Sequence, residues 1–222
     1  MADGYRPTRV WDPPTRVFHW GIVILICTSW LSQHEDWMTV HFFAGYTLLA
    51  ALVFRLAWGF VGSDTARFAR FLKGPVAVVR HVARLPRREP DSEIGHNPAG
   101  GWVILIMLIL LLVQVGTGLC ANDEVSVQGP LADAVGSSAS DWLTHIHAVN
   151  FRLIEAAVVL HLAAVLGYRV LKGHRLTTAM ITGRKRLPGS PIPPRMASSL
   201  LAAAIFVAAA GFVWLGVEWF GN

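Results

Sequence analysis

The chain has 222 residues, of which 54% are hydrophobic and only 15% are charged. Soluble globular domains carry roughly 25% charged residues, so the composition excludes an ordinary soluble domain and favours a membrane protein. The formal net charge of +5 has to be interpreted through the positions of the basic residues, and it does not by itself indicate nucleic-acid binding.

Five stretches are long and apolar enough to cross a bilayer as helices, for which about 20 residues are needed. The first four lie within a predicted domain of residues 1–185. A basic, proline-rich linker at residues 186–196 then leads to a fifth, C-terminal transmembrane helix in residues 197–222. The sequence thus predicts an all-α membrane protein with spans at residues 17–31, 40–60, 98–121, 145–171 and 197–220.

The lysines and arginines between these stretches mark one side of the membrane. Three precede the first stretch, seven lie in residues 61–99 and six in residues 172–196. The two other connections, residues 32–39 and 122–144, contain no lysine or arginine and hold six acidic residues. By the positive-inside rule the N-terminus is expected in the cytoplasm and the C-terminus outside. The net charge is therefore attributed to membrane topology.

The connection between the second and third stretches has a pattern of its own. Aromatic and aliphatic residues alternate there with arginine and lysine between residues 65 and 85, which is typical of a helix at the membrane surface. The dipeptide Gly74-Pro75 is expected to interrupt this helix.

Four histidines fall at two matching depths. His19 is at the cytoplasmic end of the first stretch, and His41 is at the outer end of the second. His147 and His161 lie in the fourth stretch, 14 residues apart, so they leave the same helix face with roughly 21 Å between them along the axis. Because this stretch runs inward, His147 shares the outer level with His41, and His161 shares the inner level with His19.

Two neutral imidazoles from facing helices at equal depth are the natural ligands of a hexacoordinate haem. The two pairs therefore indicate two non-covalent haem b groups with bis-histidine ligation, although a single histidine of this kind more often serves in packing. Covalent attachment is not expected, because the sequence contains no CxxCH motif. His145 is 16 residues from His161, about 160° around the helix, and is set aside as a ligand.

Three further residues are candidates for contacts near the inner haem. Arg16 and Arg55 lie near the cytoplasmic ends of their spans, where an arginine suits the anionic haem propionates. His96 precedes the third stretch in the string Gly95-His96-Asn97-Pro98. Helix capping by Asn97, with Pro98 in the first turn, is the simpler explanation of that string, and a propionate or quinone contact of His96 is the alternative.

Several motifs resemble the bacterial cytochrome b561 family, in particular the branch that includes the cytochrome b subunits of membrane-bound nickel–iron hydrogenases. The resemblance covers roughly residues 9–185. It implies a four-helix bundle in the bacterial inner membrane that holds two b haems and exchanges electrons between quinone and a redox partner. The motifs are Trp11-Asp12-Pro13, Arg16-Val17-Phe18-His19-Trp20, His41 with Gly45, Arg55-Leu56-Ala57-Trp58-Gly59, Ala66-Arg67-Phe68, Gly74-Pro75, Gly95-His96-Asn97-Pro98, and His147 with His161.

The expected function is electron transfer between a periplasmic redox partner, either a cytochrome c or a hydrogenase-type protein, and the quinone pool. A stand-alone superoxide:quinone oxidoreductase is the alternative within the same family, but outer loops without lysine or arginine do not attract an anion. A haem-free transporter or proton channel is a third interpretation. The fifth stretch has no candidate ligand and is expected to pack outside the bundle as a lipid-embedded anchor, a homodimer contact being the other interpretation.

Overall fold

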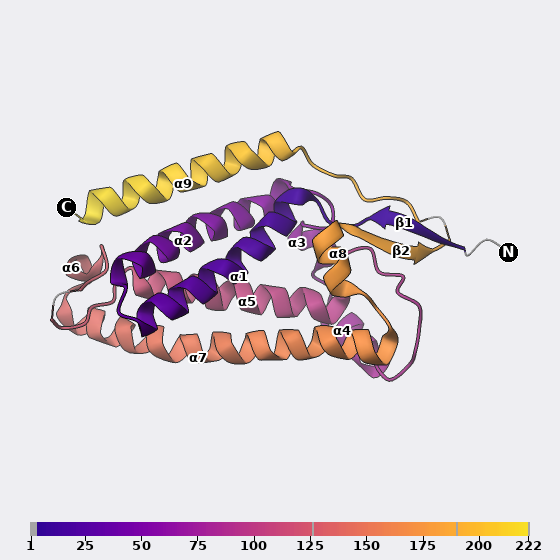
Figure 1. Cartoon of the computed structure of the whole chain (residues 1–222), viewed down its shortest axis with the longest axis horizontal. Coiled ribbons are helices and arrows are strands. Elements are labelled where there is room, and N and C mark those ends of the chain that lie inside the picture. Colours follow the sequence, from indigo (N-terminus) through magenta and orange to yellow (C-terminus); the bar gives the residue numbers. More distant parts are fainter. Residues whose placement is uncertain (1–3, 126, 190, 222) are drawn as a thin grey trace. The chain divides into compact units, whose positions relative to one another are not determined.

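The computed structural model describes residues 4–125, 127–189 and 191–221, and within them five helices are long and apolar enough to span a membrane (Figure 1). This confirms the prediction of a helical, multi-pass membrane protein. The fourth of these segments begins earlier than predicted, at Ser137, and runs on through a π-helical turn to Lys172. The five helices are α1 (Pro13–His34), α2 (Met38–Val61), α5 (Pro98–Gly118), α7 (Ser137–Gly167) and α9 (Ser199–Gly221).

Shorter elements connect these helices. The amphipathic connection forms two helices on either side of Gly74, as the sequence predicts. Pro75 occupies the first turn of the second one, where its missing N–H costs no hydrogen bond. The short elements are α3 (Phe68–Phe71), α4 (Pro75–Ala83), α6 (Ala132–Val135), the π-helical η1 (Tyr168–Lys172) and α8 (Leu176–Thr182).

A small antiparallel sheet, which was not predicted, joins the two ends of the region of residues 9–185 that carries the family resemblance. Strand β1 (Tyr5–Arg9) pairs with β2 (Arg184–Pro188), with Arg9 opposite Arg184. Lys185 and Leu187 are buried while their neighbours on β2 are exposed, so the strand has the expected period of two. Leu187 packs in a small core with Val10. The predicted linker at residues 186–196 therefore begins inside a strand.

The chain folds into two compact units, each built from several segments. The first unit comprises Met1–Val17, Leu56–Ile106 and Val158–Ala202, and the second comprises Phe18–Arg55, Met107–Ala157 and Ala203–Asn222. All three basic segments of the sequence belong to the first unit, and both acidic loops belong to the second. The charge pattern that predicted the membrane topology thus also separates the two units.

Asp12 organises the start of α1 in the first unit. Its Oδ1 accepts a hydrogen bond of 2.6 Å from the Thr15 backbone N–H, which caps the helix. Its Oδ2 accepts a bond of 3.2 Å from Nε1 of Trp58 on α2. Asp12 and Trp58 are both fully buried. The Trp-Asp-Pro motif therefore fixes where α1 begins and ties it to the end of α2.

Candidate functional site

The structure brings His41 of α2 and His147 of α7 together within the second unit. Their ring centroids are 6.3 Å apart, with an interplanar angle of 73°. With metal–nitrogen bonds of about 2 Å, and roughly 1 Å more from nitrogen to ring centre, two imidazoles that shared one iron would have centroids about 6 Å apart. The observed separation therefore fits a single iron held between the two rings.

Backbone carbonyls orient both of these rings. Nδ1 of His41 lies 2.9 Å from the Ser29 carbonyl oxygen, and Nδ1 of His147 lies 2.9 Å from the Gln114 carbonyl oxygen. A carbonyl only accepts, so in each ring Nδ1 is the protonated nitrogen and Nε2 keeps its lone pair. A metal-bound histidine typically donates its second ring nitrogen to such a carbonyl. In both rings Nε2 is thus the nitrogen that would bind a haem iron.

Gly118 of α5 allows the close approach of His147. A Cβ atom added at Gly118 would lie 2.8 Å from Cε1 of His147, whereas carbon atoms normally approach to about 3.5–4.0 Å. Any larger residue at position 118 therefore displaces the imidazole. By contrast, a Cβ at Gly116 meets no atom within 4 Å.

Several polar side chains around His147 escaped the sequence analysis, among them Thr117, whose Oγ1 lies 3.2 Å from Nδ1 of His147. Nε2 of Gln114 lies 3.0 Å from Nε2 of His147, and Nδ2 of Asn150 donates to Oε1 of Gln114 at 2.7 Å. Asn150 is buried and also donates to the Leu110 carbonyl at 2.9 Å. The Gln114 amide uses the lone pair that an iron would take, so binding requires this half-buried side chain to turn away. Polar residues inside apolar helices were the available signal.

The candidates for the inner haem are divided between the units. His19 and Arg55 belong to the second unit, whereas Arg16, His96 and His161 belong to the first. The His19 and His161 pair stays a prediction from depth. The His19 ring makes an edge contact with Trp20 at 5.0 Å, and the buried Arg55 guanidinium lies 6.0 Å from the Phe18 ring centre.

Arg16 has the surroundings expected of a side chain that binds an anion. Its Nε atom is buried and has no hydrogen-bond partner within the described part of the chain. One terminal nitrogen lies against Gly183, where a Cβ would approach it to 2.7 Å. A buried donor without a partner costs about 1–3 kcal/mol, and a carboxylate such as a haem propionate would remove that cost. Arg16 by itself is therefore suited to contact an anionic group.

His96 has a structural explanation in the first unit. Its ring packs against Trp11 and Phe71, with centroid distances of 4.5 and 5.0 Å. Asn97 caps α5, because its Oδ1 accepts a bond of 2.8 Å from the Gly100 backbone N–H. The capping prediction for Asn97 is thus confirmed.

The family of the chain follows from its sequence match. Residues 10–183 match the family model described as prokaryotic cytochrome b561. The chain belongs to the prokaryotic cytochrome b561 family. This confirms the resemblance expected from the motifs, and the match ends before β2 and α9. As a family member the protein is a multi-pass membrane cytochrome of the b type, which binds haem b and takes part in electron transfer.

Three curated proteins are similar over most of their length. A probable Ni/Fe-hydrogenase B-type cytochrome subunit from Rhizobium leguminosarum bv. viciae is 24% identical over 214 residues, covering 79% of this chain and 87% of the relative. Its counterpart from Rhodobacter capsulatus is 24% identical over 211 residues, with coverages of 79% and 80%. A probable Ni/Fe-hydrogenase 1 B-type cytochrome subunit from Escherichia coli (strain K12) is 23% identical over 213 residues, covering 78% of this chain and 88% of the relative. No solved structure gives a significant match.

The fifth helix of this b561-family cytochrome contacts α2 and borders a cavity. Phe206 of α9 meets Phe54 of α2 edge to face at 5.9 Å. A cavity of about 510 Å³ is lined by Tyr46 of α2, the outer loop around Pro130, and Trp214 of α9. Helix α9 therefore has protein contacts within the second unit.

Proposed function

We propose that this cytochrome transfers electrons between a periplasmic redox partner and the quinone pool through two haem b groups. His41 and His147 would hold the outer haem, and His19 and His161 the inner one. When bound, each haem supplies an iron centre that accepts and releases one electron. The observation that carries the proposal is the 6.3 Å separation of the His41 and His147 rings, because a packing contact does not require that spacing together with two carbonyl-fixed Nδ1 atoms.

The side chains around each site have separate tasks in this proposal. Ser29 and Gln114 keep the outer imidazoles in the tautomer that binds iron, through their carbonyl oxygens. Arg16, Arg55 and His96 are the candidates for contacts with the inner haem propionates, and the buried Nε of Arg16 supports this role.

The proposed topology has the N-terminus in the cytoplasm and the C-terminus in the periplasm of a bacterial inner membrane. The concentration of lysine and arginine in the first unit supports it. In this arrangement residues 1–185 form the two-haem domain, residues 186–196 form the connection that starts in β2, and residues 197–222 add the fifth transmembrane helix.

A hydrogenase-type protein is the favoured periplasmic partner, and a cytochrome c is the alternative. The relatives named as B-type subunits of Ni/Fe-hydrogenases support the first choice. The outer connections between the spans carry acidic residues without lysine or arginine, which suits a partner with a basic surface. The same charge pattern argues against superoxide as the substrate, because an anion is repelled there.

Haem counting after single substitutions tests the proposal. Pyridine haemochrome analysis of the purified, full-length wild-type protein should give two haems b per chain. The His147→Ala and His161→Ala variants should each retain one haem b per chain. His145→Ala is the matched control, because this exposed histidine lies on the same helix and should leave both haems in place. Two retained haems in both ligand variants would refute the ligand assignment.

Oxidation by quinone tests the electron acceptor separately. The dithionite-reduced wild-type cytochrome should be reoxidised when decylubiquinone is added under anaerobic conditions. In the His147→Ala and His161→Ala proteins, decylubiquinone should reoxidise the one haem that each variant retains, seen as the loss of its reduced spectrum. A wild-type protein that keeps its reduced spectrum with quinone, yet is reoxidised by a c-type cytochrome, would contradict the quinone part of the proposal.

A further inference from the structure

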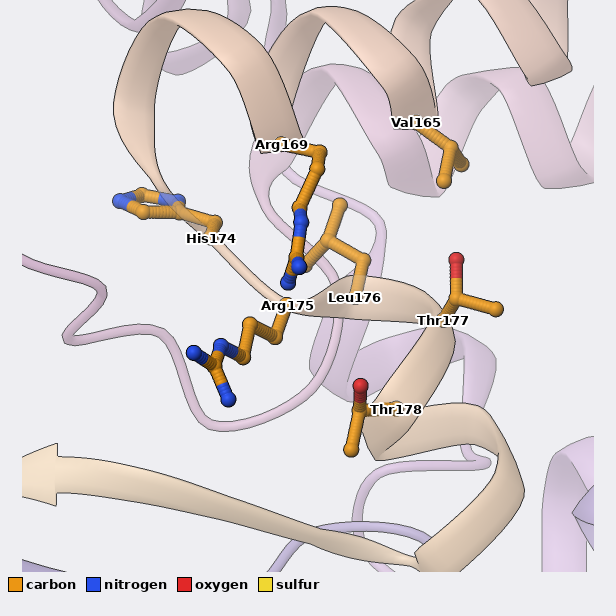
Figure 2. Close-up of a pocket in the computed structure, with 7 residues that line it drawn as sticks. All are labelled: Val165, Arg169, His174, Arg175, Leu176, Thr177 and Thr178. Atoms are coloured by element: carbon orange, nitrogen blue, oxygen red, sulfur yellow. The ribbon is translucent and has the colours of Figure 1, made fainter.

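A cavity in the first unit has no part in the proposed haem sites. It is a depression of about 260 Å³, open to the surface, where the fourth membrane-spanning segment ends and the chain turns into α8 (Figure 2). Its polar lining residues Arg169, Arg175, Thr177 and Thr178 are exposed. Two apolar side chains, Val165 and Leu176, form part of its wall. The remaining lining residues all carry hydrogen-bond donors, namely Arg169, His174, Arg175, Thr177 and Thr178.

The chain reversal after η1 brings the two arginines to this cavity. Gly173 ends the π-helical turn with φ of +74°, a left-handed conformation that glycine adopts without strain. Arg169 extends from η1 toward Leu176, while Arg175 extends from the loop that leads into α8 (Figure 2). Both arginines therefore line the cavity, each from a different segment.

The cavity is rich in positive charge that the protein does not neutralise. No aspartate or glutamate is among its lining residues. Across the described ranges, neither Arg169 nor Arg175 takes part in an ion pair. His174 is held by one ring nitrogen, which lies 2.9 Å from the Glu89 carbonyl oxygen. The two guanidinium groups and two threonine hydroxyls can donate hydrogen bonds, and the oxygen atoms of a phosphate group accept such bonds.

The position of the cavity favours a lipid over a soluble anion. The membrane-spanning segment ends at Lys172, so Arg169 lies in its last turn and Val165 about one turn deeper. Leu162, Leu166 and Val170 on the same segment are 60–63% exposed, which provides an apolar surface next to the basic one. A soluble anion would gain nothing from such a surface, whereas a lipid would contact it with its acyl chains.

We propose that this cavity binds the phosphate group of an anionic membrane phospholipid. The arginines would contact the phosphate, and the threonine hydroxyls would donate to its remaining oxygens. Basic pockets beside transmembrane helices on the cytoplasmic side commonly bind such headgroups. A zwitterionic lipid fits less well, because its ammonium group is repelled by the two guanidinium groups. The inference does not depend on the haem assignment.

Native mass spectrometry of the full-length, delipidated protein in detergent tests this proposal with dioleoylphosphatidylglycerol as the probe. Arg169→Gln/Arg175→Gln removes both guanidinium groups. Arg80→Gln/Arg87→Gln is the matched control, since both of these exposed arginines belong to the first unit but not to the cavity. We expect the affinity of the tightest lipid site to fall at least about tenfold in the cavity variant and no more than about twofold in the control.

Equal weakening in the two double variants would overturn the proposal, because it would show only general attraction to a basic surface. Equal affinity of the wild-type protein for dioleoylphosphatidylcholine would also overturn it. Inorganic phosphate that displaces the lipid at millimolar concentration in the wild-type protein would assign the cavity to a soluble anion. If the double cavity variant fails to fold, Arg175→Gln alone, in the exposed loop, provides the same comparison against Arg80→Gln.

Discussion

Gly118 offers a sharp test of the outer haem site. The Cβ of Gly118→Ala would lie 2.8 Å from Cε1 of His147, about 0.7 Å or more inside the normal contact distance of carbon atoms. Because His147 is also held by the Gln114 carbonyl, the ring has to give up either its position or that hydrogen bond. Overpacking of this kind costs about 1–3 kcal/mol.

That cost should appear in haem affinity, since the apoprotein relieves the clash by moving the ring and the haem-bound form does not. A loss of 1–3 kcal/mol weakens binding at the outer site by roughly 5- to 150-fold. Spectroscopic titration of apoprotein with haemin should show one unchanged and one weakened binding step. Gly116→Ala on the same helix is the control, because no atom lies within 4 Å of its added Cβ. Equal titration curves for Gly118→Ala, Gly116→Ala and the wild type would refute the reasoning.

Three further predictions concern the supporting structure. Asp12→Ala removes the cap of α1 and leaves the Trp58 indole N–H without its acceptor. The free energy of unfolding should therefore fall by about 2–4 kcal/mol, measured as a lower Tm. Asp12→Asn keeps the cap, so its free energy of unfolding should fall less. Asn150→Leu removes the donor that holds the Gln114 amide beside His147, so redox titration should show a changed midpoint potential for the haem that is lost in His147→Ala and an unchanged one for the other; unchanged potentials of both haems would contradict a role of Gln114 at the outer site. Burial, reinforced by Lys172 and opposed by Glu93 and Glu89, lowers the pKa of His81. The unfolded chain therefore binds a proton that the folded one does not, and stability should fall as the pH drops below about 6.5. His81→Phe should reduce that dependence in thermal unfolding between pH 7.5 and 5.5, and an unchanged dependence would contradict it.

The long helices and the outer histidine pair could be predicted because their signals are local or periodic. A span needs only an uninterrupted apolar stretch, and 14 residues between His147 and His161 fix their common helix face whatever surrounds them. Depth from the positive-inside rule then paired His41 with His147, and the structure brings these two rings together.

The unpredicted features depend on contacts between distant residues. The strand β2 is mostly basic, and its buried Lys185 is compensated by an ion pair of 3.0 Å with Asp91, a partner that no sequence window around residue 185 contains. The early start of α7 at Ser137 was missed because its first two turns are polar and apolar length was the signal used. Gln114 and Asn150 stand out in the sequence as polar residues within apolar helices, but their hydrogen bond to one another is visible only in the structure.

The central claim is that the haem ligands are paired by depth, and low-temperature EPR of the oxidised, full-length protein tests it most directly. The wild type should show two low-spin ferric signals typical of bis-histidine haem. His41→Ala and His147→Ala should each remove the same signal, and His19→Ala and His161→Ala should each remove the other. Loss of different signals by His41→Ala and His147→Ala would contradict the pairing that the structure supports.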